Sequence, residues 1–114
     1  MKKSLTREER LRSGSDIHHV LRNPGRISRC KGAKLVACQN NLRANRFTAI
    51  SIKKLGSAVK RNYAKRILKE IYRNLKCEVN IGYDIVIVSY SGEYNYTERE
   101  EHFIELIRKA NIAK

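Results

Sequence analysis

The chain has 114 residues, of which 41% are apolar and 32% charged, and this length fits one domain over residues 1–114 with a modest core. No apolar run approaches the ~20 residues that a membrane-spanning helix needs, and no apolar segment typical of a secretion signal follows the first lysines. The three cysteines are widely spaced and form no zinc motif. We therefore expect a cytoplasmic protein with no membrane partner.

The charge is strongly basic and unevenly distributed. The net charge is +14, and residues 1–76 carry 21 basic and 4 acidic side chains, whereas residues 77–114 carry 4 basic and 7 acidic ones. A positive field concentrated on one part of a small domain indicates a polyanionic partner. Nucleic acid ranks first among such partners, ahead of an anionic membrane surface or an acidic protein.

The N-terminal quarter of the chain contains signals for two short helices. Thr-Arg-Glu-Glu at residues 6–9 is a capping box that predicts a short helix through Leu11. Ser15 and Asp16 predict the start of a second helix with apolar residues at 17, 20 and 21, and Asn-Pro-Gly at residues 23–25 ends it.

The remaining pattern predicts strands and helices in alternation. Residues 33–39 and 46–53 favour two strands joined by a polar turn, which suggests an antiparallel hairpin. Residues 85–88 form a β-branched run typical of a strand buried on both faces. A capping box at Thr97 predicts a final amphipathic helix. The order strand, helix, strand from residue 46 to residue 88 implies a parallel pair joined by the intervening helix.

This intervening helix is the most informative element of the sequence. Ser57 can cap it, it extends to about Leu75, and basic residues at 61, 65, 69 and 73 recur every four positions opposite an apolar face. Like charges at this spacing weaken a helix by ~0.2–0.5 kcal/mol per pair. A polyanion would relieve that repulsion, and the Lys-Lys-Leu-Gly-Ser corner before the helix also favours phosphate, although it is no Walker loop.

No pattern for catalysis by the protein itself is present. His18 and His19 are adjacent on a predicted helix and point about 100° apart, so we interpret them as solvated or packing residues rather than metal ligands. The chain lacks a nucleophile elbow, a metal-ligand motif and a spaced carboxylate pair in its basic segment. We expect no active site in the protein alone, no bound cofactor and no small-molecule substrate.

Residues 53–66, Lys-Lys-Leu-Gly-Ser-Ala-Val-Lys-Arg-Asn-Tyr-Ala-Lys-Arg, strongly resemble the signature of the bacterial ribonuclease P protein subunit, and the similarity extends in order over almost the whole chain. The resemblance implies an α+β fold, a small mixed four-stranded sheet packed with about three helices. It also implies a left-handed strand–helix–strand crossover and the sandwich found in the second domain of a small-subunit ribosomal protein. The implied partners are the catalytic ribonuclease P RNA and precursor tRNA, whose 5′ leader the RNA removes with its own Mg²⁺.

The resemblance also assigns roles to individual positions. The residues implied to contact RNA are Lys53, Lys54, Lys60, Arg61, Asn62, Lys65, Arg66, Lys69 and Arg73. The residues implied to form the leader groove are Ile17, Leu21, Lys34 and Val36, with Cys38 on the same strand face. Tyr63 stands where the family has Arg, and Ile17 and Leu21 stand where it has Phe. Because aliphatic side chains do not stack on bases, we expect this groove to hold the leader by shape and charge.

Two other functions fit the charge. One is a structural RNA-binding protein of the ribosomal type, which would have no effect on precursor cleavage. The other is a DNA-binding regulator that places the basic helix in the major groove. A groove-reading helix needs base-reading side chains, and this helix is rich in phosphate-binding lysine, so the regulator ranks below the structural protein.

Overall fold

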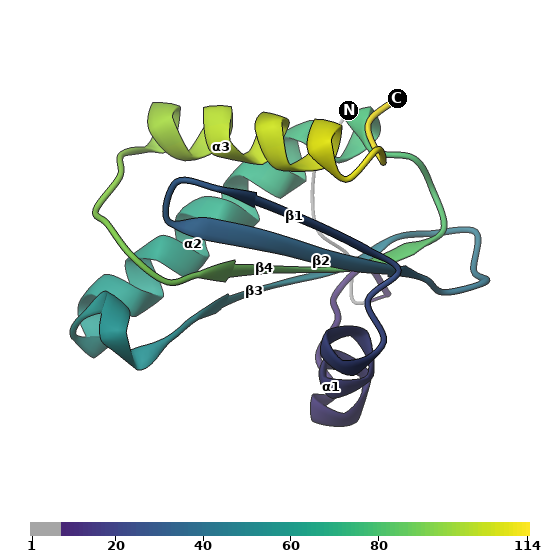
Figure 1. Cartoon of the computed structure of the whole chain (residues 1–114), viewed down its shortest axis with the longest axis horizontal. Coiled ribbons are helices and arrows are strands. Elements are labelled where there is room, and N and C mark those ends of the chain that lie inside the picture. Colours follow the sequence, from purple (N-terminus) through teal and green to yellow (C-terminus); the bar gives the residue numbers. More distant parts are fainter. Residues whose placement is uncertain (1–7) are drawn as a thin grey trace.

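The computed structural model describes residues 8–114 and contains one four-stranded mixed sheet with three α-helices (Figure 1). In chain order the elements are α1 (Gly14–Arg22), β1 (Arg26–Cys30), β2 (Ala33–Gln39), β3 (Arg46–Ser51), the short 3-10 helix η1 (Lys53–Leu55), α2 (Ala58–Leu75), the short 3-10 helix η2 (Lys76–Glu78), β4 (Tyr83–Ser89) and α3 (Tyr96–Lys109). No helix within residues 8–114 combines the length and the apolar character needed to cross a bilayer.

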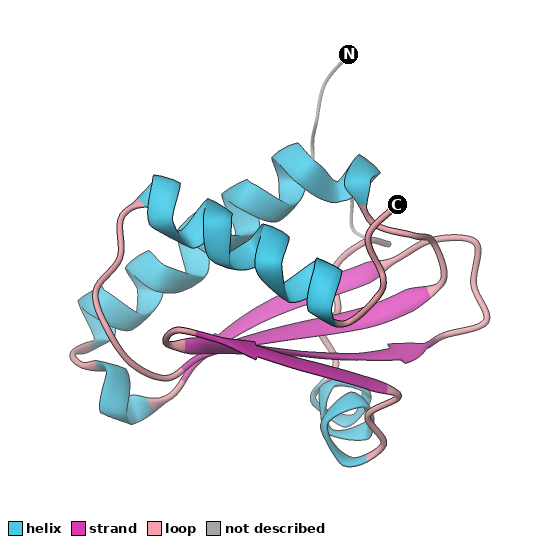
Figure 2. Ribbon diagram, turned by 45° about the horizontal axis from the view of Figure 1, so that its top comes forward, coloured by secondary structure: helices cyan, strands magenta, loops and turns pink. Residues whose placement is uncertain are grey.

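The strands lie in the order β1-β2-β4-β3. β1 and β4 both pair antiparallel with β2, and β3 pairs parallel with β4. α2 makes the connection from β3 to β4, which confirms the predicted parallel pair joined by the basic helix. α2 and α3 lie on one face of the sheet and α1 lies on the other (Figures 1 and 2).

The predicted hairpin between residues 33–39 and 46–53 is wrong, because β4 lies between β2 and β3. The hairpin partner of β2 is instead β1, which residue patterns had not indicated. Gly32 turns the chain between them with a φ of 77°, a conformation that favours glycine. Ser28 is the only buried residue of β1. Because that residue is polar, the sequence of β1 lacks the alternating apolar pattern that predicts a strand, and only its pairing with β2 identifies it.

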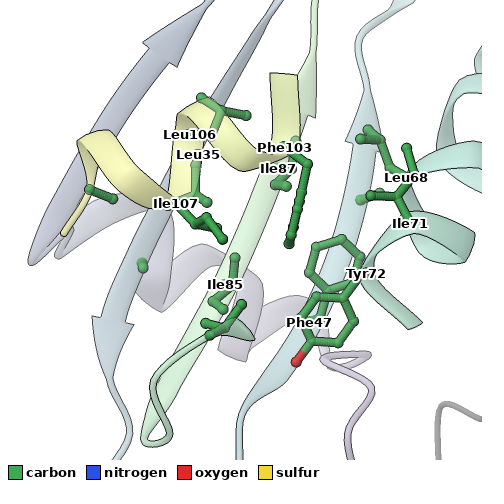
Figure 3. Packing of buried hydrophobic residues seen from close by; sticks show 14 of the residues in the cluster. Leu35, Phe47, Leu68, Ile71, Tyr72, Ile85, Ile87, Phe103, Leu106 and Ile107 are labelled. Carbon is green, nitrogen blue, oxygen red and sulfur yellow. The ribbon is translucent and has the colours of Figure 1, made fainter. Parts of the chain in front are cut away.

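The main core lies between the sheet and the helices α2 and α3. The Phe47 and Tyr72 rings stack there with centroids 4.2 Å apart, and Phe103 meets Tyr72 edge-on at 6.3 Å (Figure 3). Ile85 and Ile87 of β4 complete this side. These contacts hold α2 with its apolar face toward the sheet and its charged face outward.

A smaller core lies between the sheet and α1. Val20 of α1 packs there with Val36, Val86 and Val88. Every residue of β4 is buried, and its side chains alternate between the two cores. The predicted burial of this strand on both faces is therefore confirmed.

Three predicted helix starts differ from the structure. Residues 8–10 form a turn and a bridge to β3 rather than the helix predicted through Leu11, while residues 6 and 7 lie outside the described part. α1 is capped by Ser13, not Ser15. The capping box of α3 is Asn95 with Glu98, not Thr97 with Glu100. In α1 and α3 a polar side chain two residues before the predicted cap accepts from the free N–H groups of the first turn.

Candidate nucleic-acid interface

α2 begins and ends as its sequence predicts. The Ser57 side chain accepts a hydrogen bond from the backbone N–H of Lys60 at 3.3 Å, which satisfies one free donor of the first turn. Ala64, Leu68 and Ile71 face the core. The opposite face carries the basic side chains and is open to solvent.

The basic ridge of α2 is unevenly exposed. Arg61 and Lys65 are half-buried, and the Ser51 hydroxyl at the end of β3 donates to the Arg61 carbonyl at 3.1 Å, so this end of the ridge lies against the sheet. Each basic residue of the ridge lies about 40° further around the helix axis than the one four positions before it, because four residues exceed one helical turn. The ridge therefore winds from the buried border toward the open side, where Lys69 is exposed.

The most exposed polar strip of α2 is formed by Asn62, Arg66 and Lys69. Arg73, one turn further, is half-buried and paired with Glu70. Asn62, Arg66, Lys69 and Arg73, which the resemblance assigned to RNA contact, thus lie on one side of α2, whereas Lys53 and Lys54 precede the helix and Lys60 lies on its other side. Within α2, Asn62, Arg66 and Lys69 offer accessible donors.

A second segment adds two arginines that the sequence analysis missed. Arg10 and Arg12 lie on the extended segment beside β3, where the Leu11 N–H donates to the Phe47 carbonyl at 3.0 Å. With α2 they line a groove of about 480 Å³. Its basic lining residues are Arg10, Arg12, Arg66, Lys69 and Arg73. The alternation of Arg10, Leu11 and Arg12 could have predicted an extended segment with Leu11 buried and the two arginines exposed.

The N-terminal end of the helix carries the remaining predicted cations. Lys53 and Lys54 are exposed in η1, immediately before α2. Lys60 forms an exposed ion pair with Glu93, whose carboxylate lies 2.5 Å from the Lys60 ammonium. That hydrogen bond and the lysine charge lower the pKa of Glu93. Predicted cations are therefore present from the segment before α2 to its last turn.

The predicted leader-groove residues lie on the α1 side of the sheet but differ in exposure. Val36 is 3% exposed and forms the floor of the small core beneath α1, so it supports the helix rather than lining an open surface. Ile17 is half-buried against the same core. Leu21, with 37% of its surface exposed, and half-buried Lys34 are open to a ligand. Cys38 is buried.

β1 contributes two further residues to this side of the sheet. Ile27 pairs across the strands with Val36, and Arg29 pairs with Lys34. Because cross-strand partners point to the same face, Arg29 and Lys34 form a positive pair on the α1 side, with exposed Ile27 next to them along β1. No sequence signal indicated them, since β1 itself was not recognised.

A partly buried network of ion pairs joins α1 to the sheet. The guanidinium of Arg46 donates to both oxygens of Asp84, at 2.8 and 2.6 Å, and also reaches Asp16 of α1 at 3.4 Å. The hydrogen bonds to Asp84 raise the pKa of Arg46. The Asn40 amide donates to the same carboxylate at 3.0 Å. This network holds the predicted groove helix against the start of β4.

No candidate metal site accompanies these surfaces in the described part of the chain. His18 and His19 are exposed on α1. Within residues 8–114, no three His, Cys, Asp or Glu side chains come together in a way that could hold a metal ion. The arrangement provides positive charge, hydrogen-bond donors and a half-open sheet face, which are the elements of a binding surface.

Comparison with known proteins identifies this arrangement. A protein-family model described as Ribonuclease P matches residues 5–111. The ribonuclease P protein component of Clostridium botulinum strain 657 is 35% identical, over 93% of this chain and 97% of its own length. That of Syntrophomonas wolfei is 32% identical, over 95% and 92%.

Solved structures support the same fold. The RNase P protein of Staphylococcus aureus aligns with a TM-score of 0.80 at 18% identity, covering 93% of this chain and 98% of its own. The RNase P protein of Thermotoga maritima aligns with a TM-score of 0.77 at 22% identity, covering 88% and 96%. The α+β fold that the resemblance implied is confirmed, and the relatives do not favour a ribosomal or DNA-binding alternative. The chain belongs to the ribonuclease P protein family and is a protein component of this tRNA-processing ribonucleoprotein.

Proposed function

We propose that this protein binds the catalytic RNA of ribonuclease P through α2 and the groove beside it, and thereby assists removal of the 5′ leader from precursor tRNA. The observation that carries the proposal is the convergence of two separate basic segments on one groove, with Arg10 and Arg12 facing Arg66, Lys69 and Arg73. Cations from different segments at one surface are suited to several backbone phosphates at once.

The protein would act through charge and position rather than through chemistry of its own. Catalytic RNA and precursor tRNA are both polyanions, and a net charge of +14 lowers the repulsion between them. Mg²⁺ held by the RNA would supply the hydrolytic chemistry. The contribution of this chain is to neutralise phosphates at the basic groove and to guide the leader across the sheet.

The leader would lie on the α1 side of the sheet. The support for this placement is the open positive pair of Arg29 and Lys34, with exposed Ile27 next to it along β1, and exposed Leu21 on α1, which lies on the same side of the sheet. The α1 helix forms one wall of this surface, and the Arg46 network holds that wall in place. None of these leader-side residues is aromatic, so the grip would depend on shape and charge.

We infer that the protein acts in the cytoplasm. Cys30, Cys38 and Cys77 are all free thiols, and Cys77 is exposed. Unpaired and accessible cysteines are typical of a reducing compartment. Precursor tRNA, the proposed substrate of the ribonucleoprotein, would be met there.

The test of the proposed function is reconstitution. A bacterial ribonuclease P RNA and a precursor tRNA with a 5′ leader are incubated at low Mg²⁺ with and without this protein. We expect the protein to restore cleavage at the mature 5′ end. Binding of the RNA without any gain in cleavage would contradict the proposal and favour a purely structural RNA-binding protein.

A substitution on α1 tests the leader groove. Leu21→Phe should tighten binding of precursor tRNA by about fivefold or more, because base–aromatic stacking contributes ~1–3 kcal/mol per base. The measurement is the ratio of affinities for tRNA with and without a five-nucleotide leader, with the reconstituted ribonucleoprotein. Leu42→Phe is the matched control, since Leu42 is 50% exposed on the loop between β2 and β3. An equal gain with both variants would place the leader elsewhere.

A further inference from the structure

A pocket separate from the basic groove lies between α2 and the loop that leads into α3. Its volume is about 300 Å³, at the lower end of the range for small-ligand sites. Leu55, Val59, Tyr63 and Tyr94 give it apolar and aromatic walls. Val59 and Tyr63 are 78% and 52% exposed, so both side chains are open to a ligand at this pocket.

The remaining lining of the pocket contains a buried cation without an anionic partner. Arg99 of α3 is 1% exposed and forms no ion pair with any residue in the described part of the chain. Its Nη1 atom is buried without a hydrogen-bond partner. Its guanidinium lies 4.8 Å from the centre of the Tyr94 ring, and burial lowers its pKa. A buried and unpaired charge is costly to folding, so its presence needs a reason.

The surroundings of the pocket connect it to RNA. Arg66 lines both this pocket and the basic groove, so a strand that follows α2 passes the mouth of the pocket. Lys60 lies at the mouth, where Glu93 holds it. RNA is recognised mainly through unpaired bases that stack on aromatic side chains and present their edges to polar groups.

The chemistry of Arg99 limits which base fits. A guanidinium only donates hydrogen bonds. Guanine presents two acceptors, N7 and O6, on one edge, and uracil has two carbonyl oxygens and no amino group, whereas adenine has no carbonyl oxygen and the single carbonyl of cytosine shares its pairing edge with an amino donor. The Tyr94 ring keeps its cation–π contact with the guanidinium, and a base carbonyl oxygen that enters the pocket beside Tyr63 can accept the hydrogen bond that Nη1 lacks.

We propose that this pocket receives one unpaired guanosine or uridine of the ribonuclease P RNA, with the base against Tyr63, its carbonyl oxygen accepting from Arg99, and its phosphate at Lys60. This inference rests on the proposed function, because it names a nucleotide site on the same RNA. In the complex the phosphate replaces the Glu93 carboxylate as the ion-pair partner of Lys60.

The test combines chemical probing of the RNA with four variants of the full chain. Kethoxal modifies unpaired guanines, and a water-soluble carbodiimide modifies unpaired uracils. Arg99→Met and Tyr63→Ala remove the two contacts to the base, while Tyr63→Phe keeps the stacking ring. Arg108→Met is the matched control, because it removes one arginine charge from an exposed position of the same helix, outside the pocket.

The expected result is one guanine or uracil that the wild-type protein, Tyr63→Phe and Arg108→Met protect and that Arg99→Met and Tyr63→Ala leave reactive. The last two should bind the RNA about fivefold or more weakly, as loss of one stacked base predicts. Arg99→Met should also melt at the same or a higher temperature, because it removes a buried unpaired charge. Weaker binding by a more stable variant cannot result from misfolding.

Protection of the same guanines and uracils by all variants would overturn the inference, and so would protection that depends on Tyr63 but not on Arg99. Should Arg99→Met fail to fold, the arginine has a structural role and the nucleotide site is rejected. Cleavage by the reconstituted ribonucleoprotein separates the two proposals. If the wild-type protein restores cleavage without any Arg99-dependent protection, only the nucleotide site fails. If it neither binds the RNA nor restores cleavage, both fail.

Discussion

Replacing Arg66 and Lys69 together with alanine should weaken binding to ribonuclease P RNA by about 10- to 100-fold. Both side chains are exposed on α2 and line the basic groove, and a hydrogen bond to a charged group contributes ~1.5 kcal/mol or more. The dependence of affinity on salt should flatten as well, by ~0.7–0.9 in log–log slope for each lost phosphate contact. Titration at several salt concentrations measures both effects.

The control removes the same charge from another surface. Arg108→Ala with Lys114→Ala also lowers the net charge by two, and both residues are exposed at the C-terminal end of the chain. We expect this variant to keep the wild-type salt slope. If the two double variants behave alike, RNA binding depends on total charge and the groove has no special role.

Asp84→Ala should lower the free energy of unfolding by about 2–3 kcal/mol, because it leaves the Arg46 guanidinium partly buried without its main partner. Asp84 is 4% exposed and accepts three hydrogen bonds, two from Arg46 and one from Asn40. Since Arg46 also contacts Asp16, the variant should loosen α1 over the sheet. Urea denaturation measures the stability, and precursor affinity reports on the groove.

Asp16→Ala is the comparison for this change. Its side chain is 45% exposed and lies 3.4 Å from Arg46, and solvent screens such a pair, so the expected loss is below about 1 kcal/mol. Equal losses for the two variants would mean that Asp84 does not act as a buried partner. A stable Asp84→Ala protein with unchanged leader affinity would show that the network does not position α1.

The sequence by itself determined the elements whose signals are local. The basic helix is predicted from Ser57 to about Leu75, because a cap, an apolar arc and a four-residue repeat of basic side chains coincide there, and α2 occupies that segment. The buried run at residues 85–88 identifies β4, which lies between two cores. The net charge and the match to a family signature likewise indicated an RNA partner without any knowledge of the fold.

Tertiary structure alone decided which segments meet. β2 pairs with β1 and β4 rather than with β3, since strand partners follow from the packing of the whole sheet and not from neighbouring residues. Arg10 and Arg12 join the basic groove only because Leu11 is buried beside Phe47. The sequence pattern of the amphipathic helix does not distinguish Arg99 from an exposed arginine. Its burial, and the pocket it lines with Tyr63, arise because α3 packs against α2 and so brings together two residues that are 36 positions apart in the sequence.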